Sequence, residues 1–206
     1  MSLHGKTVLV TGGTGALGSV IVRRFIGEGS SVGVSYVIDE ELVRFRKSFQ
    51  EKALALKADV TKEPDVKSLF DSVVAKYGQI DIVVNTVGGF LAKKPVAEVS
   101  LEEWDLMMNM NLKSAFLCTR EALRRMEGQP YGRIVNMSAM VGLAPSPGRA
   151  PYAISKSGVS LLTDLAAQEV KGSGITVNAI APSIIKTEAN LAFMPDEDSK
   201  KWVRPE

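Results

Sequence analysis

A tyrosine and a lysine stand four residues apart, at Tyr152 and Lys156, in the segment PYAISKSG. On a helix, residues with this spacing lie on one face as neighbours. A free phenol has a pKa of about 10, so it exchanges protons slowly near neutral pH unless a positive charge stabilises the phenolate. A lysine ammonium about 4 Å away supplies about 4 kcal/mol at an effective dielectric constant of about 20, before burial acts in the opposite sense. The pair could therefore act as an acid and base on a carbonyl or alcohol oxygen.

A run of glycines near the N-terminus could bind phosphate. Gly12, Gly15 and Gly18 follow the apolar run VLVT and precede a segment of helical periodicity. A helix N-terminus carries unpaired N–H groups and partial positive charge, so a backbone without side chains there lets a diphosphate approach closely. Glycine-rich turns also join many strands to helices without binding anything, so the motif alone leaves both readings open.

The elements that must position these residues alternate along the chain. Short runs rich in β-branched residues predict strands, and segments of helical periodicity lie between them. The runs are continuously apolar, which is typical of a parallel sheet covered by helices on both faces. We expect strands at residues 7–12, 31–36, 53–60, 80–89, 132–138 and 174–182, and helices near residues 16–28, 39–50, 63–77, 100–127 and 152–171. The sequence thus predicts an α/β fold with a doubly wound parallel sheet, the Rossmann fold, as a single domain over residues 1–206.

Ligands of doubly wound sheets bind beyond the carboxyl ends of the strands. The residues that end each apolar run should therefore face one cleft, although any loop start is polar and the pattern also fits ordinary loops. Ser138 ends the run before the helix that carries Tyr152, so it could hold the same substrate oxygen. Local signals predict helix starts at Ser100, with Glu103 as a capping box, and at Thr61, with Pro64 in the first turn. Residues 143–151 are rich in proline and predict a loop.

Composition argues against several function classes. The 206 residues are 45% hydrophobic with a formal net charge of +2, and the basic residues are scattered, so we expect no nucleic-acid partner. No apolar run reaches the length of a membrane span, so we expect no membrane partner and a cytoplasmic protein. Cys118 is the only cysteine and His4 the only histidine, so a disulfide, a histidine-based metal site and a Ser-His-Asp triad are not expected. Cys118 lies in an apolar run and should be a buried thiol.

With these motifs in place, the chain resembles the short-chain dehydrogenase/reductase family, in its single-domain branch. The resemblance rests on the segments KTVLVTGGTGALG, ADVT, IDIVVNTVGG, NMNLKSAF, GRIVNMS, YAISK and ITVNAIAPSIIKTEAN. It implies an NAD(P)-dependent oxidoreductase that transfers a hydride between nicotinamide and a carbonyl or secondary alcohol. It also implies a homodimer or homotetramer that associates through the helices at 100–127 and 152–171.

The resemblance implies a catalytic tetrad of Asn111, Ser138, Tyr152 and Lys156. In the family the tyrosine is the acid and base, the serine orients the substrate oxygen, and the asparagine supports a proton-relay water. The lysine binds the nicotinamide ribose and lowers the pKa of the tyrosine. The cofactor-binding residues that it implies are Gly12, Thr14, Gly15, Leu17, Gly18, Ser35, Tyr36, Asp59, Val60, Asn85, Gly88, Pro182, Ile184 and Thr187, together with Tyr152 and Lys156.

The chain departs from the family pattern in several places. The glycine spacing matches the extended branch, because Ala16 stands where the single-domain branch has glycine, and Ser183 replaces the usual glycine after Pro182. An extended-branch sugar-nucleotide epimerase or dehydratase is therefore a weaker alternative, and a non-catalytic NAD(P)-binding or interaction protein is another. Related chains continue with one more helix and strand, so we expect this chain to lack both.

Cofactor choice and substrate are less well specified. An acid at the end of the second strand normally binds the ribose 2′-hydroxyl and repels a 2′-phosphate. Ser35 and Tyr36 stand there and Asp39 comes three residues later, so NADP is slightly favoured over NAD. The expected substrate lining is mostly apolar and suits a small hydrophobic carbonyl; it comprises Gly89, Phe90, Ala139, Met140, Leu143 and residues 190–198. We expect the acidic run at 196–198 to be solvated, in a mobile lid, and not to bind metal.

Overall fold

The computed structural model describes residues 2–194 and 198–206, and its centre is one parallel sheet. The strand order is β3-β2-β1-β4-β5-β6. The strands are β1 (Thr7–Thr11), β2 (Ser31–Tyr36), β3 (Ala53–Lys57), β4 (Ile82–Asn85), β5 (Gly132–Met137) and β6 (Ile175–Ile180). Thr11 pairs with Asn85 and Asn85 with Asn136, so these strands end together at one edge of the sheet. The predicted doubly wound parallel sheet is confirmed.

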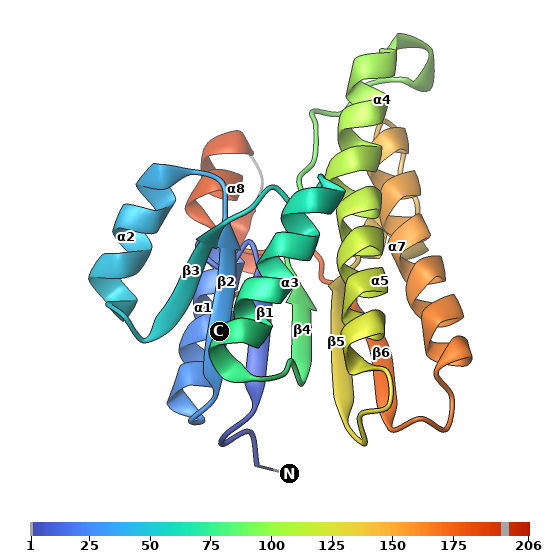
Figure 1. Ribbon diagram of the computed structural model, residues 1–206. Coiled ribbons are helices and arrows are strands. Elements are labelled where there is room, and N and C mark those ends of the chain that lie inside the picture. The colour runs from blue at the N-terminus through green and yellow to red at the C-terminus, as the bar shows by residue number, and fades with distance from the viewer. Residues whose placement is uncertain (1, 195–197) are drawn as a thin grey trace.

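Helices cover both faces of the sheet (Figure 1). α1 (Ala16–Gly27) and α2 (Asp39–Phe49) pack on one face. α3 (Glu63–Tyr77), α5 (Ser114–Met126) and α7 (Ala150–Glu169) pack on the other. The shorter elements are α4 (Leu101–Met107), α6 (Met140–Leu143), α8 (Glu188–Phe193), a π-helix (Met108–Lys113) and two 3₁₀-helices (Val96–Glu98 and Ser199–Lys201).

Strand β1 separates two hydrophobic cores. Val8 and Val10 face α1 and α2, whereas Leu9 between them faces α3 and α5, because successive strand side chains point to opposite faces. All three are fully buried, and burying one such side chain contributes about 1.5–3 kcal/mol. Cys118 belongs to the second of these cores, and burial raises the pKa of its thiol to about 12. The expected buried thiol is therefore confirmed.

The long helix expected over residues 100–127 is three elements, α4, the π-helix and α5. Ser114 donates its N–H to the carbonyl of Asn109, five residues back, which is the π-helical hydrogen bond. Helical periodicity could not reveal the π-helix, since the helical segments before and after it are both amphipathic. The capping box of Ser100 and Glu103 is confirmed.

Two other local predictions need correction. Thr61 does not cap α3, because its hydroxyl donates to Asp59 at 2.7 Å and Lys62 is the flanking residue, without a side-chain cap. The loop expected over 143–151 is shorter, because α6 ends at Leu143 and α7 begins at Ala150. Pro151 accounts for the earlier start of α7, since proline is favoured in the first helical turn.

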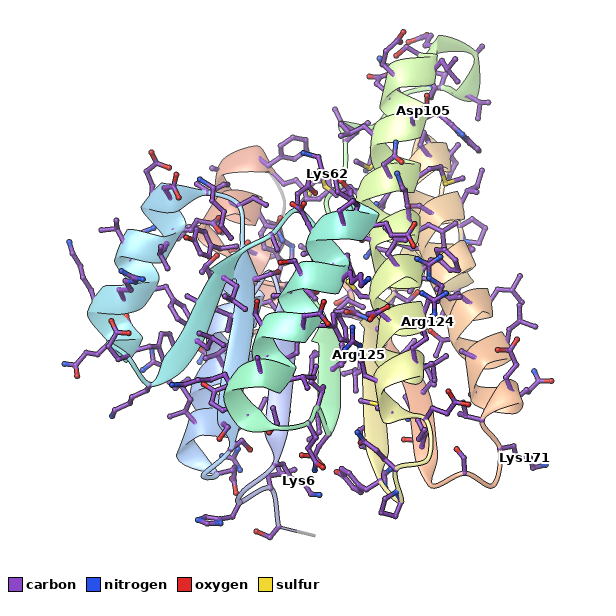
Figure 2. All side chains as sticks on the ribbon, in the orientation of Figure 1. Lys6, Lys62, Asp105, Arg124, Arg125 and Lys171 are labelled. Carbon is purple, nitrogen blue, oxygen red and sulfur yellow. The ribbon has the colours of Figure 1, made fainter. Side chains whose placement is uncertain are left out.

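Charged side chains lie mainly on the outer surfaces of the helices (Figure 2). Arg125 of α5 reaches toward α3 and pairs with Asp71 at 2.6 Å and with Glu121 at 2.8 Å. Such surface pairs contribute little, about 0–1 kcal/mol each. None of the helices in the described part of the chain is both long and apolar enough to span a bilayer.

Candidate active site

A cavity of about 700 Å³ opens at the carboxyl ends of β4, β5 and β6. The predicted site residues that line it are Leu17, Gly88, Ser138, Tyr152, Lys156, Pro182, Ile184 and Thr187. The predicted site residues outside its lining are Gly12, Thr14, Gly15, Gly18, Ser35, Tyr36, Asp59, Val60, Asn85 and Asn111. Residues from five separate segments of the sequence therefore meet at the edge where the sheet topology places the strand ends.

Tyr152 lies in the first turn of α7 and Lys156 lies one turn later, and both line this cavity. Burial raises the pKa of the Tyr152 phenol, and the neighbouring charge that lowers it is that of Arg149. Lys156 is buried, which lowers the pKa of its ammonium to about 8, and its Nζ donates to the Met137 carbonyl at 2.7 Å. In the structure the Lys156 ammonium donates to a backbone carbonyl, and the expectation that Lys156 lowers the pKa of Tyr152 stays a prediction.

Asn111 is fixed by the backbone of the segment after β4. Its Oδ1 accepts from the Gly89 N–H at 2.9 Å, and its Nδ2 donates to the Gly89 carbonyl at 3.0 Å and to Ser155 Oγ at 3.1 Å. A Cβ on Gly88 would lie 2.7 Å from Asn111 Oδ1 and 3.0 Å from Lys156 Nζ. Gly88 thus brings two predicted catalytic side chains to one point, and the π-helix places Asn111 there.

Ser138 lines the cavity but its hydroxyl also contacts α7. Ser138 Oγ lies 3.0 Å from the Lys156 carbonyl and 2.7 Å from Ser160 Oγ. A hydroxyl carries one proton, so Ser138 can donate to a substrate oxygen only by giving up its hydrogen bond to the Lys156 carbonyl, and its Oγ can then still accept from Ser160. Sequence reasoning missed Ser155 and Ser160, although both stand on the helix that carries Tyr152.

The glycine turn fits a dinucleotide diphosphate. α1 begins at Ala16 after Gly15, and neither a capping side chain nor an acid in its first turn occupies its N–H groups, which suit an anion. Gly12 has a φ of +65° and donates its N–H to Ser35 Oγ at 2.9 Å. A Cβ on Gly18 would lie 2.3 Å from the Gly12 carbonyl oxygen, so only glycine lets helix and turn approach this closely.

Several predicted cofactor-binding residues have side chains that already contact other groups of the protein. Ser35 is bound to Gly12, and Val60 belongs to the hydrophobic core. Asp59 accepts the N–H and hydroxyl of Thr61 at 3.0 and 2.7 Å. Asn85 donates to the buried Asn136 at 2.8 Å. Contact between these side chains and the cofactor stays a prediction.

The expected substrate lining is largely present. Gly89, Phe90, Ala139, Met140, Asn190, Phe193 and Met194 line the cavity. Leu143, Leu191, Ala192 and Asp198 do not, and Leu143 ends α6 with its side chain exposed. Pro195, Asp196 and Glu197 lie outside the described residues. Phe193 of α8 packs edge-on against Phe90 with ring centroids 4.7 Å apart, and this contact closes one side of the cavity. Sequence reasoning did not anticipate Arg149, the one arginine in the lining.

Comparison with known proteins decides the family. A sequence profile described as short chain dehydrogenase matches residues 6–198. The chain belongs to the short-chain dehydrogenase family. It is 38% identical over 203 residues to 3beta-hydroxysteroid dehydrogenase 1 of Eggerthella lenta, covering 96% of this chain and 77% of that protein.

Solved structures of this family have the same fold. A 3-ketoacyl-(acyl-carrier-protein) reductase from Brucella melitensis complexed with NADH matches with a TM-score of 0.91 and 27% identity, over 99% of this chain and 87% of that one. ElxO with NADP bound matches with a TM-score of 0.90 and 29% identity, over 97% of this chain and 86% of that one. This short-chain dehydrogenase is therefore an NAD(P)-dependent oxidoreductase that transfers a hydride between nicotinamide and a carbonyl or secondary alcohol. The expectation that it lacks the last helix and strand of the family stays a prediction.

Proposed function

We propose that this dehydrogenase reduces an apolar carbonyl compound in the cavity at the strand ends, with Tyr152 as the general acid. The observation that supports the proposal best is that Tyr152 and Lys156 line one cavity with Gly88 and Ser138. Two matched relatives are named for a hydroxysteroid and a ketoacyl group, and an apolar ketone of this kind suits the mostly apolar lining.

The side chains of the site have separate roles in the proposed proton transfer. NADH or NADPH, when bound, supplies the hydride. The Tyr152 hydroxyl gives its proton to the substrate oxygen as that oxygen gains charge, and Ser138 orients the same oxygen. Lys156 lines the cavity, and Asn111 lies behind the lining, where both side chains approach Gly88. In the reverse direction the Tyr152 phenolate accepts the proton of the alcohol.

The raised pKa of Tyr152 determines how the rate of each direction depends on pH. The phenol is protonated at neutral pH and burial raises its pKa further, and reduction needs the protonated form. The reduction rate should therefore fall as pH rises through the pKa of the phenol, whereas alcohol oxidation should rise over the same range. Two pH profiles of kcat/KM, one for each direction, test this assignment.

Carboxylates near the glycine turn bear on the choice between NAD and NADP. Thr14 of the glycine turn donates to the Glu41 carboxylate at 2.9 Å. Lys57 at the end of β3 is the cation at this rim, and Asp39 pairs with it at 2.7 Å. A carboxylate beside the glycine turn disfavours a 2′-phosphate. We infer a preference for NAD, against the slight preference for NADP that strand-end residues alone gave.

Association with a second copy is the remaining part of the proposal. α5 and α7 carry exposed apolar side chains at Phe116, Leu161 and Leu165, and such side chains suit a helical dimer interface. Sedimentation should show a homodimer or homotetramer, and a monomer at micromolar concentration would contradict it. A place in the cytoplasm and the lack of a nucleic-acid partner stay predictions from the sequence.

Steady-state oxidation of NADH and NADPH tests the function. A panel of ketones, aldehydes and quinones should show turnover, and fluorescence titration should show binding of both dinucleotides with NADH tighter. Binding without turnover across the panel would support a non-catalytic protein instead.

A further inference from the structure

Arg149 is a cation beside the proposed acid, and nothing in the described part of the chain neutralises it. It lines the cavity with Tyr152. The described lining contains no Asp or Glu, and none of the ion pairs within 4 Å among the described residues includes Arg149. By contrast, Arg120 and Arg125 on α5 both pair with carboxylates. An arginine facing a cavity under these conditions is a site for an anion.

The position of Arg149 on its helix does not favour folding. It immediately precedes the first turn of α7, where it makes no capping hydrogen bond, and that turn contains no acid. Helix N-termini are partially positive, so a cation there is unfavourable. A local conflict of this kind without a compensating contact is typical of functional positions.

The acidic side chain that shares a small second cavity with Arg149 is already paired. A small second cavity is lined by Arg149, Lys94 and Glu103. Glu103 pairs with Lys94 at 2.6 Å and accepts the Ser100 N–H at 2.9 Å. Its charge is therefore compensated within the capping box of α4, and Arg149 stays available to the main cavity.

We propose that Arg149 binds an anionic group of the substrate, so that the substrate is an apolar ketone or aldehyde bearing a carboxylate. This inference rests on the proposed reductase function and specifies its substrate class. A guanidinium binds a carboxylate through two parallel hydrogen bonds. The aromatic and methionine side chains of Phe90, Met140 and Phe193 hold the apolar body.

The reacting carbonyl and the carboxylate must lie within one small molecule. Arg149 precedes Tyr152 by three residues and is close enough for its charge to lower the pKa of the phenol. Oxo acids with a short apolar spacer between the two groups therefore fit, and their esters, which keep the shape but lose the charge, provide matched probes.

The test compares kcat/KM for 4-, 5-, 6- and 7-oxo-octanoate with that for each methyl ester, using NADH and NADPH. The wild type should prefer at least one acid over its ester by about 10-fold or more, since a charge-assisted pair supplies a factor of roughly 10 to 100. Arg149→Gln should bring this ratio close to one through a higher KM for the acid. Arg149→Lys should retain part of the preference.

Lys171→Gln is the matched control, because Lys171 is an exposed cation beyond the opposite end of α7 (Figure 2); it should leave both rates unchanged. Esters reduced as well as acids by the wild type, or an acid preference that survives Arg149→Gln, would overturn the inference while the reductase function stands. Absence of turnover of every acid and ester by the wild type would overturn the reductase proposal itself.

Discussion

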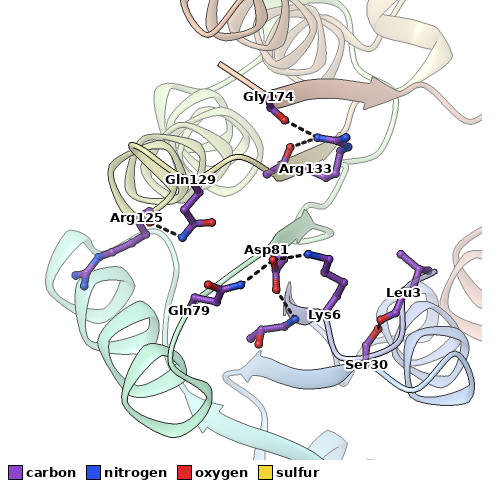
Figure 3. A network of polar contacts seen from close by, with 11 residues as sticks. Leu3, Lys6, Ser30, Gln79, Asp81, Arg125, Gln129, Arg133 and Gly174 are labelled. Carbon is purple, nitrogen blue, oxygen red and sulfur yellow. Dashed lines mark hydrogen bonds and ion pairs between the residues drawn. The ribbon is translucent and has the colours of Figure 1, made fainter. Parts of the chain in front are cut away.

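The two edges of the sheet treat polar groups in opposite ways. At the amino edge, buried Asp81 accepts from Thr7 N–H at 2.8 Å, Gln79 at 3.0 Å and Lys6 at 3.1 Å (Figure 3). At the carboxyl edge, Tyr152 and Arg149 line the cavity, and the side-chain hydrogen bonds among the described residues include neither the Tyr152 hydroxyl nor the Arg149 guanidinium. Asp81 is bonded entirely within the protein and so serves stability, whereas Tyr152 and Arg149 are left for a ligand to contact.

A third group of polar residues lies at the carboxyl edge but, like Asp81, is bonded within the protein. Asn136, fully buried at the carboxyl end of β5, bonds to Asn85 at 2.8 Å, Thr163 at 3.0 Å and Thr119 at 3.2 Å. Asn136 immediately precedes Met137 and Ser138 of the cavity lining, yet both polar atoms of its amide are bonded within the protein. Nearness to the strand ends is therefore not enough to assign a ligand-binding role.

The largest effect is expected from Gly18→Ala. The new Cβ would lie 2.3 Å from the Gly12 carbonyl oxygen, and relieving this clash costs about 3 kcal/mol, or roughly 100-fold in NADH affinity if the turn moves. Gly27→Ala in the same helix is the control, because no atom lies within 4 Å of its Cβ. Fluorescence titration with NADH should separate the two variants, and equal affinities would contradict the assigned turn.

Lys156→Met tests the cost of burying a charged ammonium at this site. Its pKa is lowered from 10.5 to about 8 in the folded protein, so between these values the unfolded chain binds a proton that the folded chain does not. Stability of the wild type should therefore rise relative to Lys156→Met by about 3 kcal/mol as pH increases through this window. Urea unfolding at pH 7 and pH 10 measures it, with Lys171→Met as control; parallel changes in both proteins would refute it.

Asp81→Asn should affect stability alone. Loss of the charge weakens three hydrogen bonds in a buried site and should lower the free energy of unfolding by about 2 kcal/mol. The turnover number should not change, because Asp81 lies at the edge opposite the cavity. A loss of activity in the folded variant would break the distinction between the two edges.

The smallest effect is expected from Glu41→Gln. Removing this carboxylate from the glycine turn should tighten NADP binding by about 5-fold and leave NAD binding nearly unchanged. Asp105→Asn, on α4 (Figure 2), is the control. Unchanged NADP affinity would mean that Glu41 does not face the 2′ position.

The sequence predicted the fold well because strand and helix periodicities are local. The apolar runs around Leu9 and Val83 gave the strands, although their ends were placed too far along the chain, since pairing length depends on the neighbouring strands. The π-helix around Asn111 and the short helix α8 could not be predicted, because tertiary hydrogen bonds and contacts such as Asn111 with Gly89 and Phe193 with Phe90 fix them.

The sequence predicted which residues form the site, but not which groups their side chains contact. The spacing of Tyr152 and Lys156 placed both at one cavity, yet the sequence could not show that Lys156 donates to the Met137 carbonyl. Arg149 lay within a segment predicted as a loop, and its proposed role depends on the lack of a paired carboxylate among the described residues. Such absences are visible only in three dimensions.

The role of Tyr152 as the general acid is tested most directly by Tyr152→Phe. The variant keeps the ring and loses only the hydroxyl, so NADH should bind with nearly unchanged affinity while the rate of ketone reduction in a single turnover falls by at least about 100-fold. A variant that binds NADH and reduces the ketone at the wild-type rate would contradict the assignment.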